Sequence, residues 1–251
     1  MSKALCIVAH PDDETMWTGG VLAALAARSW DVEIIATTRG EGGERGEPPL
    51  VPDDPLLVGR LRAAELRCAA DTLGAELTIL DYQDPPMDGD WLLACGCDPI
   101  ELTGRLRAII ASRRPLAVIT HGRAGEYGHP QHMLVNLLTR RAIETLPNSP
   151  PELWTFMAWY APAPAPDQPN LNVTDPADLV LDLGPYYFVK RQAAECHQSQ
   201  HALFRRHSET GDLDELVRHI ESLHLARSTA PLEASSLFCT LAGLRRVSDE
   251  R

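Results

Sequence analysis

The feature that most constrains the fold is an apolar run near the amino terminus that stops abruptly at a charged cluster. Leu5-Cys6-Ile7-Val8 is continuously apolar, and Ala9-His10-Pro11-Asp12-Asp13-Glu14 follows it directly. A short run without alternation, bounded by proline and charge, is typical of a strand buried on both faces in a parallel sheet. The cluster then lies at the carboxyl end of that strand, where open α/β sheets bind their ligands.

The composition of this cluster points to a bound cation. Three acids and a histidine within positions 10–14 cannot all be buried without partners, because like charges repel and burial raises the pKa of each carboxyl group. A divalent metal held between some of them is the simplest resolution.

The same alternation of apolar runs and helical patterns continues along the chain. Further strands are predicted over residues 32–37, 77–80 and 116–120, and the segments between the four strands show helical spacing over 15–28, 57–74 and 102–110. This order predicts an α/β fold with a doubly wound, mostly parallel sheet flanked by helices. Nothing in the composition marks a second core, so we expect one domain over residues 1–251.

The pattern is weaker beyond Pro151. We predict, in order, a strand over 153–161, a proline-rich loop over 161–178, a strand over 179–183, a helix over 186–206, an amphipathic helix over 215–224 and a short apolar segment over 237–244.

Charge and cysteine usage narrow the class of protein. The net charge of −12, without clustered Lys or Arg, argues against nucleic-acid and anionic-membrane partners and favours a neutral or cationic small molecule. No apolar stretch approaches the ~20 residues of a membrane span, and the start does not resemble a signal peptide. With six scattered cysteines, we expect a reduced cytoplasmic protein. Cys95-Gly96-Cys97 is one residue short of Cys-x-x-Cys, so we interpret it as loop cysteines rather than a metal or redox site.

The second half of the predicted site is Gly128-His129-Pro130-Gln131-His132, at the start of another helix. A catalytic zinc site takes three protein ligands and keeps an open position, and His10, Asp13 and His132 fit this requirement. Asp12 is then free to take a proton from the attacking water. A protonated His129, or the hydroxyl group of Tyr127, would stabilise the oxyanion that forms on an amide.

Two alternatives stay open at this point. A His-x-x-His pair is weak evidence in a chain with nine histidines, and His197 with His201 forms a rival i, i+4 pair. Two histidines and a carboxylate also bind Fe²⁺, so another divalent metal is an alternative to Zn²⁺.

The two motifs together resemble the LmbE/PIG-L family of zinc-dependent N-deacetylases. Further matching segments lie between and after them, at residues 38–42, 62–65, 73–74, 84 and 190–200. The resemblance implies a Rossmann-like fold and removal of the acetyl group from an N-acetylglucosamine-type sugar or glycoconjugate. It implies zinc ligands at His10, Asp13 and His132, a general base at Asp12, and transition-state stabilisation by His129 and Tyr127. It also implies substrate binding by Arg62, Asp84 and Glu41.

One position departs from the family pattern, because many members carry Asp where this chain has Gln131. The substitution is expected to lower the pKa of His129 relative to those members. We expect the loops over 44–55, 85–98 and 161–178 to determine substrate choice.

The resulting hypothesis is a metal-dependent amidohydrolase that acts on a C–N bond of a linear amide. The alternatives are an amidase for a larger acyl group, with the same metal machinery, and a non-catalytic sugar-binding protein. The sequence leaves a homo-oligomer open.

Overall fold

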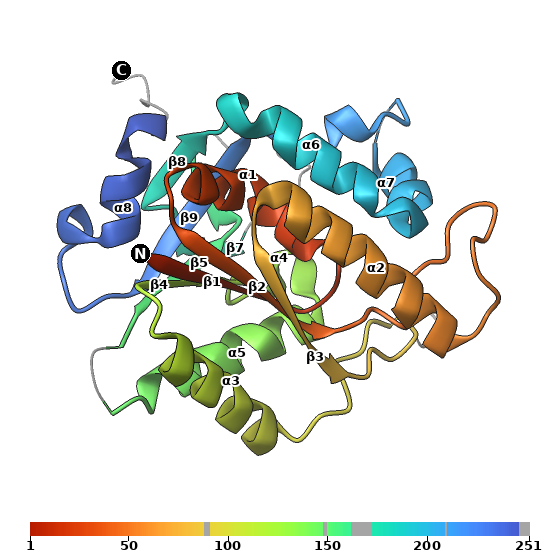
Figure 1. Cartoon of the computed structure of the whole chain (residues 1–251), viewed down its shortest axis with the longest axis horizontal. Coiled ribbons are helices and arrows are strands. Elements are labelled where there is room, and N and C mark those ends of the chain that lie inside the picture. Colours follow the sequence, from red (N-terminus) through yellow and green to blue (C-terminus); the bar gives the residue numbers. More distant parts are fainter. Residues whose placement is uncertain (88–90, 148–149, 162–171, 209, 246–251) are drawn as a thin grey trace.

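The structure is a computed structural model, and it describes residues 1–87, 91–147, 150–161, 172–208 and 210–245 (Figure 1). Its centre is a seven-stranded sheet with the strand order β3-β2-β1-β4-β5-β9-β8. The strands of this sheet are β1 (Lys3–Val8), β2 (Asp31–Thr38), β3 (Glu76–Tyr82), β4 (Ala117–Thr120), β5 (Glu152–Phe156), β8 (Leu179–Asp182) and β9 (Ile220–Arg227).

The first five strands of this order are parallel, which confirms the predicted fold class. The strand order changes direction next to β1, so the loops after β1 and β4 lie side by side at the carboxyl edge. β9 pairs antiparallel with both β5 and β8.

Helices cover both faces of the sheet. The larger helices are α1 (Asp13–Ala27), α2 (Pro55–Leu73), α3 (Pro99–Arg113), α5 (Pro130–Glu144) and α6 (Tyr187–Cys196), and the short α8 (Ser236–Leu241) lies near the carboxyl terminus. In Figure 1, α1, α2 and α6 lie on one side of the sheet and α3 and α5 on the other.

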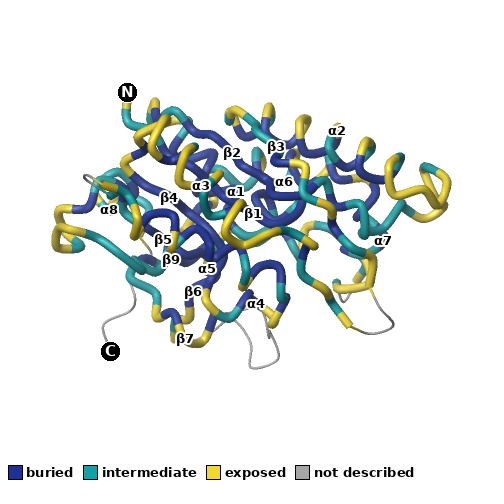
Figure 2. The backbone as a smooth tube through the Cα atoms, turned by 90° about the horizontal axis from the view of Figure 1, so that it is seen from below, coloured by how far each residue is buried: buried dark blue, intermediate teal, exposed yellow. Residues whose placement is uncertain are grey.

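Alternate residues of β1 enter two separate cores, which explains its continuous apolar sequence. Ala4, Cys6 and Val8 pack in the core under α1 and α2, whereas Leu5 and Ile7 pack in the core under α3 and α5. All five side chains are fully buried, and Figure 2 shows the central strands as continuously buried segments.

Three predictions for the carboxyl-terminal half were wrong. The predicted helix over 215–224 is replaced by the 3-10 turn Leu213–Glu215 and by β9, because strands β5 and β8 offer backbone partners on both of its edges. The predicted helix over 186–206 breaks at His197 into α6 and the short α7 (His201–His207).

The third difference concerns the segment after β5. The chain turns at Met157, which has a φ of 54°, and continues as β6 (Ala158–Trp159). The predicted loop over 161–178 contains β7 (Asn172–Pro176), which pairs with β6, while its residues 162–171 lie outside the described part. The short helix α4 (Gly125–Gly128) precedes α5.

The cysteines differ in part from the prediction. Cys68 of α2 and Cys196 of α6 form a disulfide, so the expectation of reduced thiols is wrong for this pair. Cys95 and Cys97 are free, with their Sγ atoms 3.0 Å apart. Among the described residues, no helix is both long and apolar enough to cross a membrane.

Candidate functional site

The candidate site lies at the carboxyl edge of the sheet, where loops that follow the parallel strands meet. The loop after β1 carries His10 to Asp13, the loop after β3 carries Asp84, and the segment after β4 carries the remaining histidines. His10, Asp13 and His132 are all buried, with at most 8% of each residue exposed. The structure therefore brings the two sequence motifs together.

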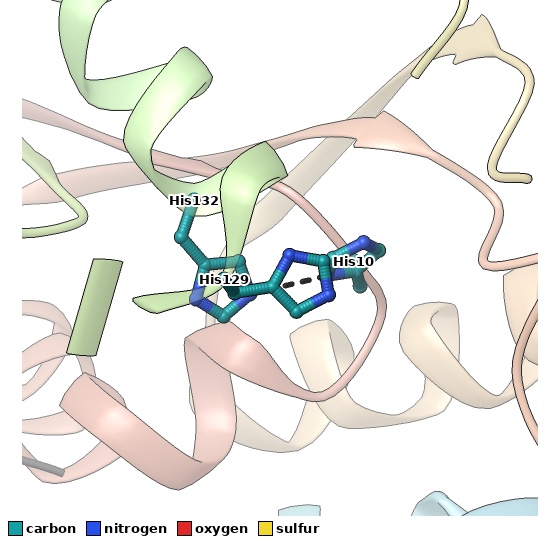
Figure 3. A group of neighbouring side chains, drawn as sticks. All are labelled: His10, His129 and His132. Atoms are coloured by element: carbon teal, nitrogen blue, oxygen red, sulfur yellow. Dashed lines mark hydrogen bonds between the residues drawn. The ribbon is translucent and has the colours of Figure 1, made fainter. Parts of the chain in front are cut away.

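His10, Asp13 and His132 bring their donor atoms close together in a cluster that we call the triangle, in which Asp13 offers a different oxygen to each histidine. His10 Nδ1 lies 3.3 Å from His132 Nε2 and 3.4 Å from Asp13 Oδ2, and His132 Nε2 lies 3.4 Å from Asp13 Oδ1. Figure 3 shows His10 facing His132 across the dashed line. Ligands at zinc bond lengths of about 2.0–2.1 Å and tetrahedral angles lie about 3.3–3.4 Å apart, so each pair of residues in the triangle has donor atoms at a spacing that suits such an ion.

Each donor of the triangle is held by a second partner. His10 Nε2 lies 3.3 Å from Asp84 Oδ1, which leaves Nδ1 for the ion. Asp13 Oδ2 accepts the backbone N–H of His10 at 2.8 Å, and Oδ1 accepts the indole N–H of Trp17 at 3.2 Å. Burial opposes a charge on His10, yet Asp13 and Asp84 raise its pKa to about 10. The surroundings of His10 therefore favour a positive charge on its ring.

His132 is held by a carboxylate that the sequence analysis did not identify. Glu126 Oε2 lies 2.6 Å from His132 Nδ1 and 2.8 Å from His121 Nδ1, and both histidines and Glu126 are buried. Burial alone would raise the pKa of Glu126, but His121 and His132 lower it to about 2. The only sequence signal was an acid within the glycine-flanked segment 125–128 and a histidine directly after a strand.

Two other groups of side chains bring donor atoms close together: His10, His129 and His132, and Asp13, His121 and His132. The second group is disfavoured because His121 Nε2 already accepts the backbone N–H of Ala9 at 2.9 Å. In the first group, the rings of His129 and His132 are stacked at 4.4 Å with an interplanar angle of 10°. Their lone pairs lie in nearly parallel planes and do not converge on one ion.

Asp12 lies beside the triangle on a strained turn. Its φ of 111° is rare for a residue with a side chain, and such strain is often found at functional sites. Its backbone N–H donates to Glu14 Oε2 at 3.0 Å, and its Oδ2 lies 3.3 Å from Arg62 Nη2. Burial raises the pKa of Asp12 to about 6, although the charge of Arg62 opposes the shift. A carboxylate with such a pKa is suited to act as a general base near neutral pH.

Arg62, Asp84 and Glu41, the residues predicted to bind substrate, lie at the same edge of the sheet. Their hydrogen bonds connect α2 with the loops after β1 and β2, and the loop after β2 with the loop after β3. Arg62 is 4% exposed and donates to the carbonyl oxygens of Gly40 and Pro11. A Cβ atom at Gly43 would lie 1.9 Å from Arg62 Nη1, which accounts for a glycine there. Glu41 accepts the backbone N–H of Asp84 at 3.2 Å.

His129 and Tyr127 border the triangle, but His129 differs from the expected cation. Burial and the nearby His10 and His132 lower the pKa of His129 to about 3. Its Nδ1 accepts the backbone N–H of Gln131 at the start of α5, so the neutral ring carries its proton on Nε2. Tyr127 is 47% exposed and packs edge-on against the rings of His129 and His132.

The rival pair of histidines does not form a metal site. His197 Nε2 lies 3.0 Å from Glu14 Oε1 in the interior, whereas His201 Nε2 faces the carbonyl oxygen of Ala194 at 3.4 Å. The helix break at His197 removes the i, i+4 geometry on which that alternative depended.

Comparison with known proteins places the chain in a family. The sequence profile of the PIG-L family, described as GlcNAc-PI de-N-acetylase, matches residues 5–143. A 1D-myo-inositol 2-acetamido-2-deoxy-alpha-D-glucopyranoside deacetylase of Rhodococcus jostii is 32% identical over 241 residues, with 79% of this chain and 81% of the relative covered.

Two solved structures share the fold at 20% identity. The 4-carboxy-2-hydroxymuconate hydratase GalB of Pseudomonas putida has a TM-score of 0.66 over 92% of this chain and 98% of its own. N,N'-diacetylchitobiose deacetylase of Pyrococcus horikoshii has a TM-score of 0.64, covering 89% of this chain and 83% of its own. One fold thus carries different reactions, and the sequence match is what decides the family: the chain belongs to the PIG-L (LmbE) family.

Proposed function

We propose that this protein is a metal-dependent hydrolase that removes the acetyl group from an N-acetylglucosamine-type sugar or glycoconjugate. The observation that carries the proposal is the triangle of His10, Asp13 and His132 with the carboxylate of Asp12 beside it. The name of the Rhodococcus jostii relative, a deacetylase of an acetamido sugar joined to inositol, supports this substrate class.

The donor set suits zinc and also accepts Fe²⁺ or another divalent metal. The triangle would hold the ion through His10 Nδ1, one oxygen of Asp13 and His132 Nε2. When bound, a zinc ion supplies Lewis acidity toward the amide carbonyl and lowers the pKa of water from about 15.7 toward about 7.

The side chains of the site can perform the proton transfers of amide hydrolysis. Asp12 takes the proton of the attacking water, and Arg62 holds the Asp12 carboxylate at 3.3 Å. The neutral ring of His129, protonated on Nε2, and the hydroxyl group of Tyr127 donate to the developing oxyanion. Protonated Asp12 then delivers its proton to the leaving amine, which becomes the free amino group of the sugar.

The test is acetate release from a panel of N-acetylglucosamine conjugates and from matching conjugates with longer acyl groups. Metal-stripped protein is assayed with and without added zinc. We expect metal-dependent acetate release that varies with the group attached to the sugar. Hydrolysis of only the longer acyl amides would favour the amidase alternative, and stoichiometric metal binding without hydrolysis of any conjugate would contradict the proposal.

A further inference from the structure

The carboxylate of Glu126 is fully used by the surrounding protein. Oε2 faces Nδ1 of both His132 and His121, while Oε1 accepts the backbone N–H of Gly122 at 2.8 Å and Asn172 Nδ2 at 3.0 Å. Four partners occupy the lone-pair directions that an ionised carboxylate offers. The Glu126 carboxylate therefore lies on the Nδ1 side of the His132 ring, away from the triangle.

These contacts determine which nitrogen of His132 faces the triangle. An ionised carboxylate only accepts hydrogen bonds, so Nδ1 of His132 carries the proton and Nε2 keeps its lone pair. The ring is also confined on its two faces. His121 stacks against it at 4.0 Å and His129 at 4.4 Å, so the stack sets the plane of the ring and Glu126 sets its rotation within that plane.

The backbone around Glu126 is arranged to keep this carboxylate in place. Glu126 has φ 60° and ψ −66°, a conformation rarely adopted by residues with side chains. Its backbone N–H donates to Asn172 Oδ1 at 3.1 Å, so one asparagine from β7 holds both ends of the residue. Asn172 fits because position 122 is glycine, where a Cβ atom would lie 2.0 Å from the asparagine side chain.

Gln131, the residue before His132 in sequence, does not hold the His132 ring. Gln131 is fully buried, and within the described part of the chain both polar atoms of its side chain lack a hydrogen-bond partner. Orientation of His132 therefore comes from Glu126, six positions earlier, and not from its immediate neighbour.

We propose that Glu126 is a positioning residue, which fixes the tautomer and orientation of His132 so that Nε2 faces the metal position. The inference rests on the proposed function only in taking His132 as a ligand. Carboxylates that hold the second nitrogen of a ligand histidine commonly strengthen metal binding by about 10–100-fold.

The first test needs no substitution. NMR of the metal-free wild-type protein, labelled with 15N-histidine, reads the tautomer of each ring. We expect His132 and His121 to carry their protons on Nδ1. A proton on Nε2 of His132 would overturn the inference, whatever the enzyme hydrolyses.

The second test compares two buried carboxylates. Glu126→Gln replaces one carboxylate oxygen with an NH2 donor and so cannot accept from all four N–H groups around it, and we expect zinc affinity, measured by competition with a chelator, to fall about 10–100-fold. Glu221→Gln is the matched control, because Glu221 is also buried but holds Gly20, Val21 and Lys190 away from the site.

Unchanged zinc affinity in Glu126→Gln, or an equal loss in both variants, would refute a specific role for Glu126. Cobalt-loaded protein adds a readout of geometry, since a change in its visible spectrum in Glu126→Gln but not in Glu221→Gln reports a shifted ligand. If wild-type protein binds zinc but releases no acetate, the proposed function fails while both tests of Glu126 still apply.

Discussion

The two ends of the same parallel strands handle charge in opposite ways. At the amino end, Glu33 receives Arg113 Nε at 2.8 Å and Lys3 Nζ at 3.4 Å, and Lys3 also pairs with Asp31 at 3.1 Å. These cations are lysine and arginine, which keep their charge at any physiological pH. The amino end therefore neutralises its acids within the chain.

At the carboxyl end, acids outnumber permanent cations. The carboxylates of Asp12, Asp13, Glu14, Asp84 and Glu126 gather there, and Arg62 is the guanidinium that the described residues place in an ion pair with one of them. Histidines supply the other partners. One end of the sheet thus pairs its acids with permanent cations, whereas the other pairs most of them with histidines, whose charge can be lost; this histidine-paired end is where we propose that the metal binds.

The largest effect is expected when a donor of the triangle is removed. Asp13→Ala deletes the carboxylate that lies within 3.4 Å of both histidine donors, so stoichiometric zinc binding and hydrolysis should both be lost. Metal content and acetate release are the measurements. Full activity with bound zinc in this variant would show that Asp13 is not a ligand.

Removing the proposed base should separate metal binding from chemistry. Asp12→Asn should lower kcat about 10²–10⁴-fold, because an amide cannot take the proton of the attacking water, while zinc content stays stoichiometric. A parallel loss of metal would indicate that Asp12 holds the ion instead.

Zinc should stabilise the protein only through the carboxyl end of the sheet, where the triangle lies. At a free zinc concentration 100-fold above Kd, the free energy of unfolding should rise by about 2.7 kcal/mol. Glu33→Gln should keep this increment and Asp13→Ala should lose it, as measured by denaturant unfolding with and without zinc. A lost increment in Glu33→Gln would mean that the two ends are coupled.

The smallest effect concerns acid stability at the amino end. Burial favours a higher pKa for Glu33, but Arg113, Thr78 and Lys3 outweigh it and hold the pKa below its ordinary value of 4.5. A folded pKa below the unfolded one means that stability is present above about pH 4.5 and is lost as pH falls through the folded pKa.

Glu33→Gln should therefore reduce stability on the order of 1 kcal/mol at pH 7, and the difference from wild type should shrink in acid. Unfolding curves at several pH values measure it. A difference that persists unchanged below the folded pKa would assign the loss to packing rather than to charge.

The parallel half of the fold could be predicted from the sequence because a strand that is buried on both faces has a continuous apolar sequence. β1 and β4 contain continuous apolar runs, and α5 starts with proline at the predicted place. β9 has no such sequence pattern, because it forms a strand only by pairing with β5 and β8, which lie far away in sequence. The Cys68–Cys196 disulfide could not be predicted from local sequence patterns either, because its two cysteines are 128 residues apart.

The site shows the same division. The approach of His10, Asp13 and His132 followed from strand ends that share one edge, so spacing and topology were enough to predict it. Glu126 required a backbone turn with positive φ and an asparagine 46 residues later, and neither can be read from the local pattern. The neutral state of His129 depends on its burial and on the nearby rings of His10 and His132, which come together only in the folded chain.

The contact between Gly122 and Asn172 has a consequence for engineering. A library that seeks new substrates would naturally vary the segment after β6, yet Asn172 at its far end is tied to the carboxylate behind His132. Diversity at positions 122, 126 and 172 would yield many inactive clones for reasons unrelated to substrate recognition. Holding these three positions constant while varying the loop over 44–50, which we expect to influence substrate choice, would keep the carboxylate behind His132 in place.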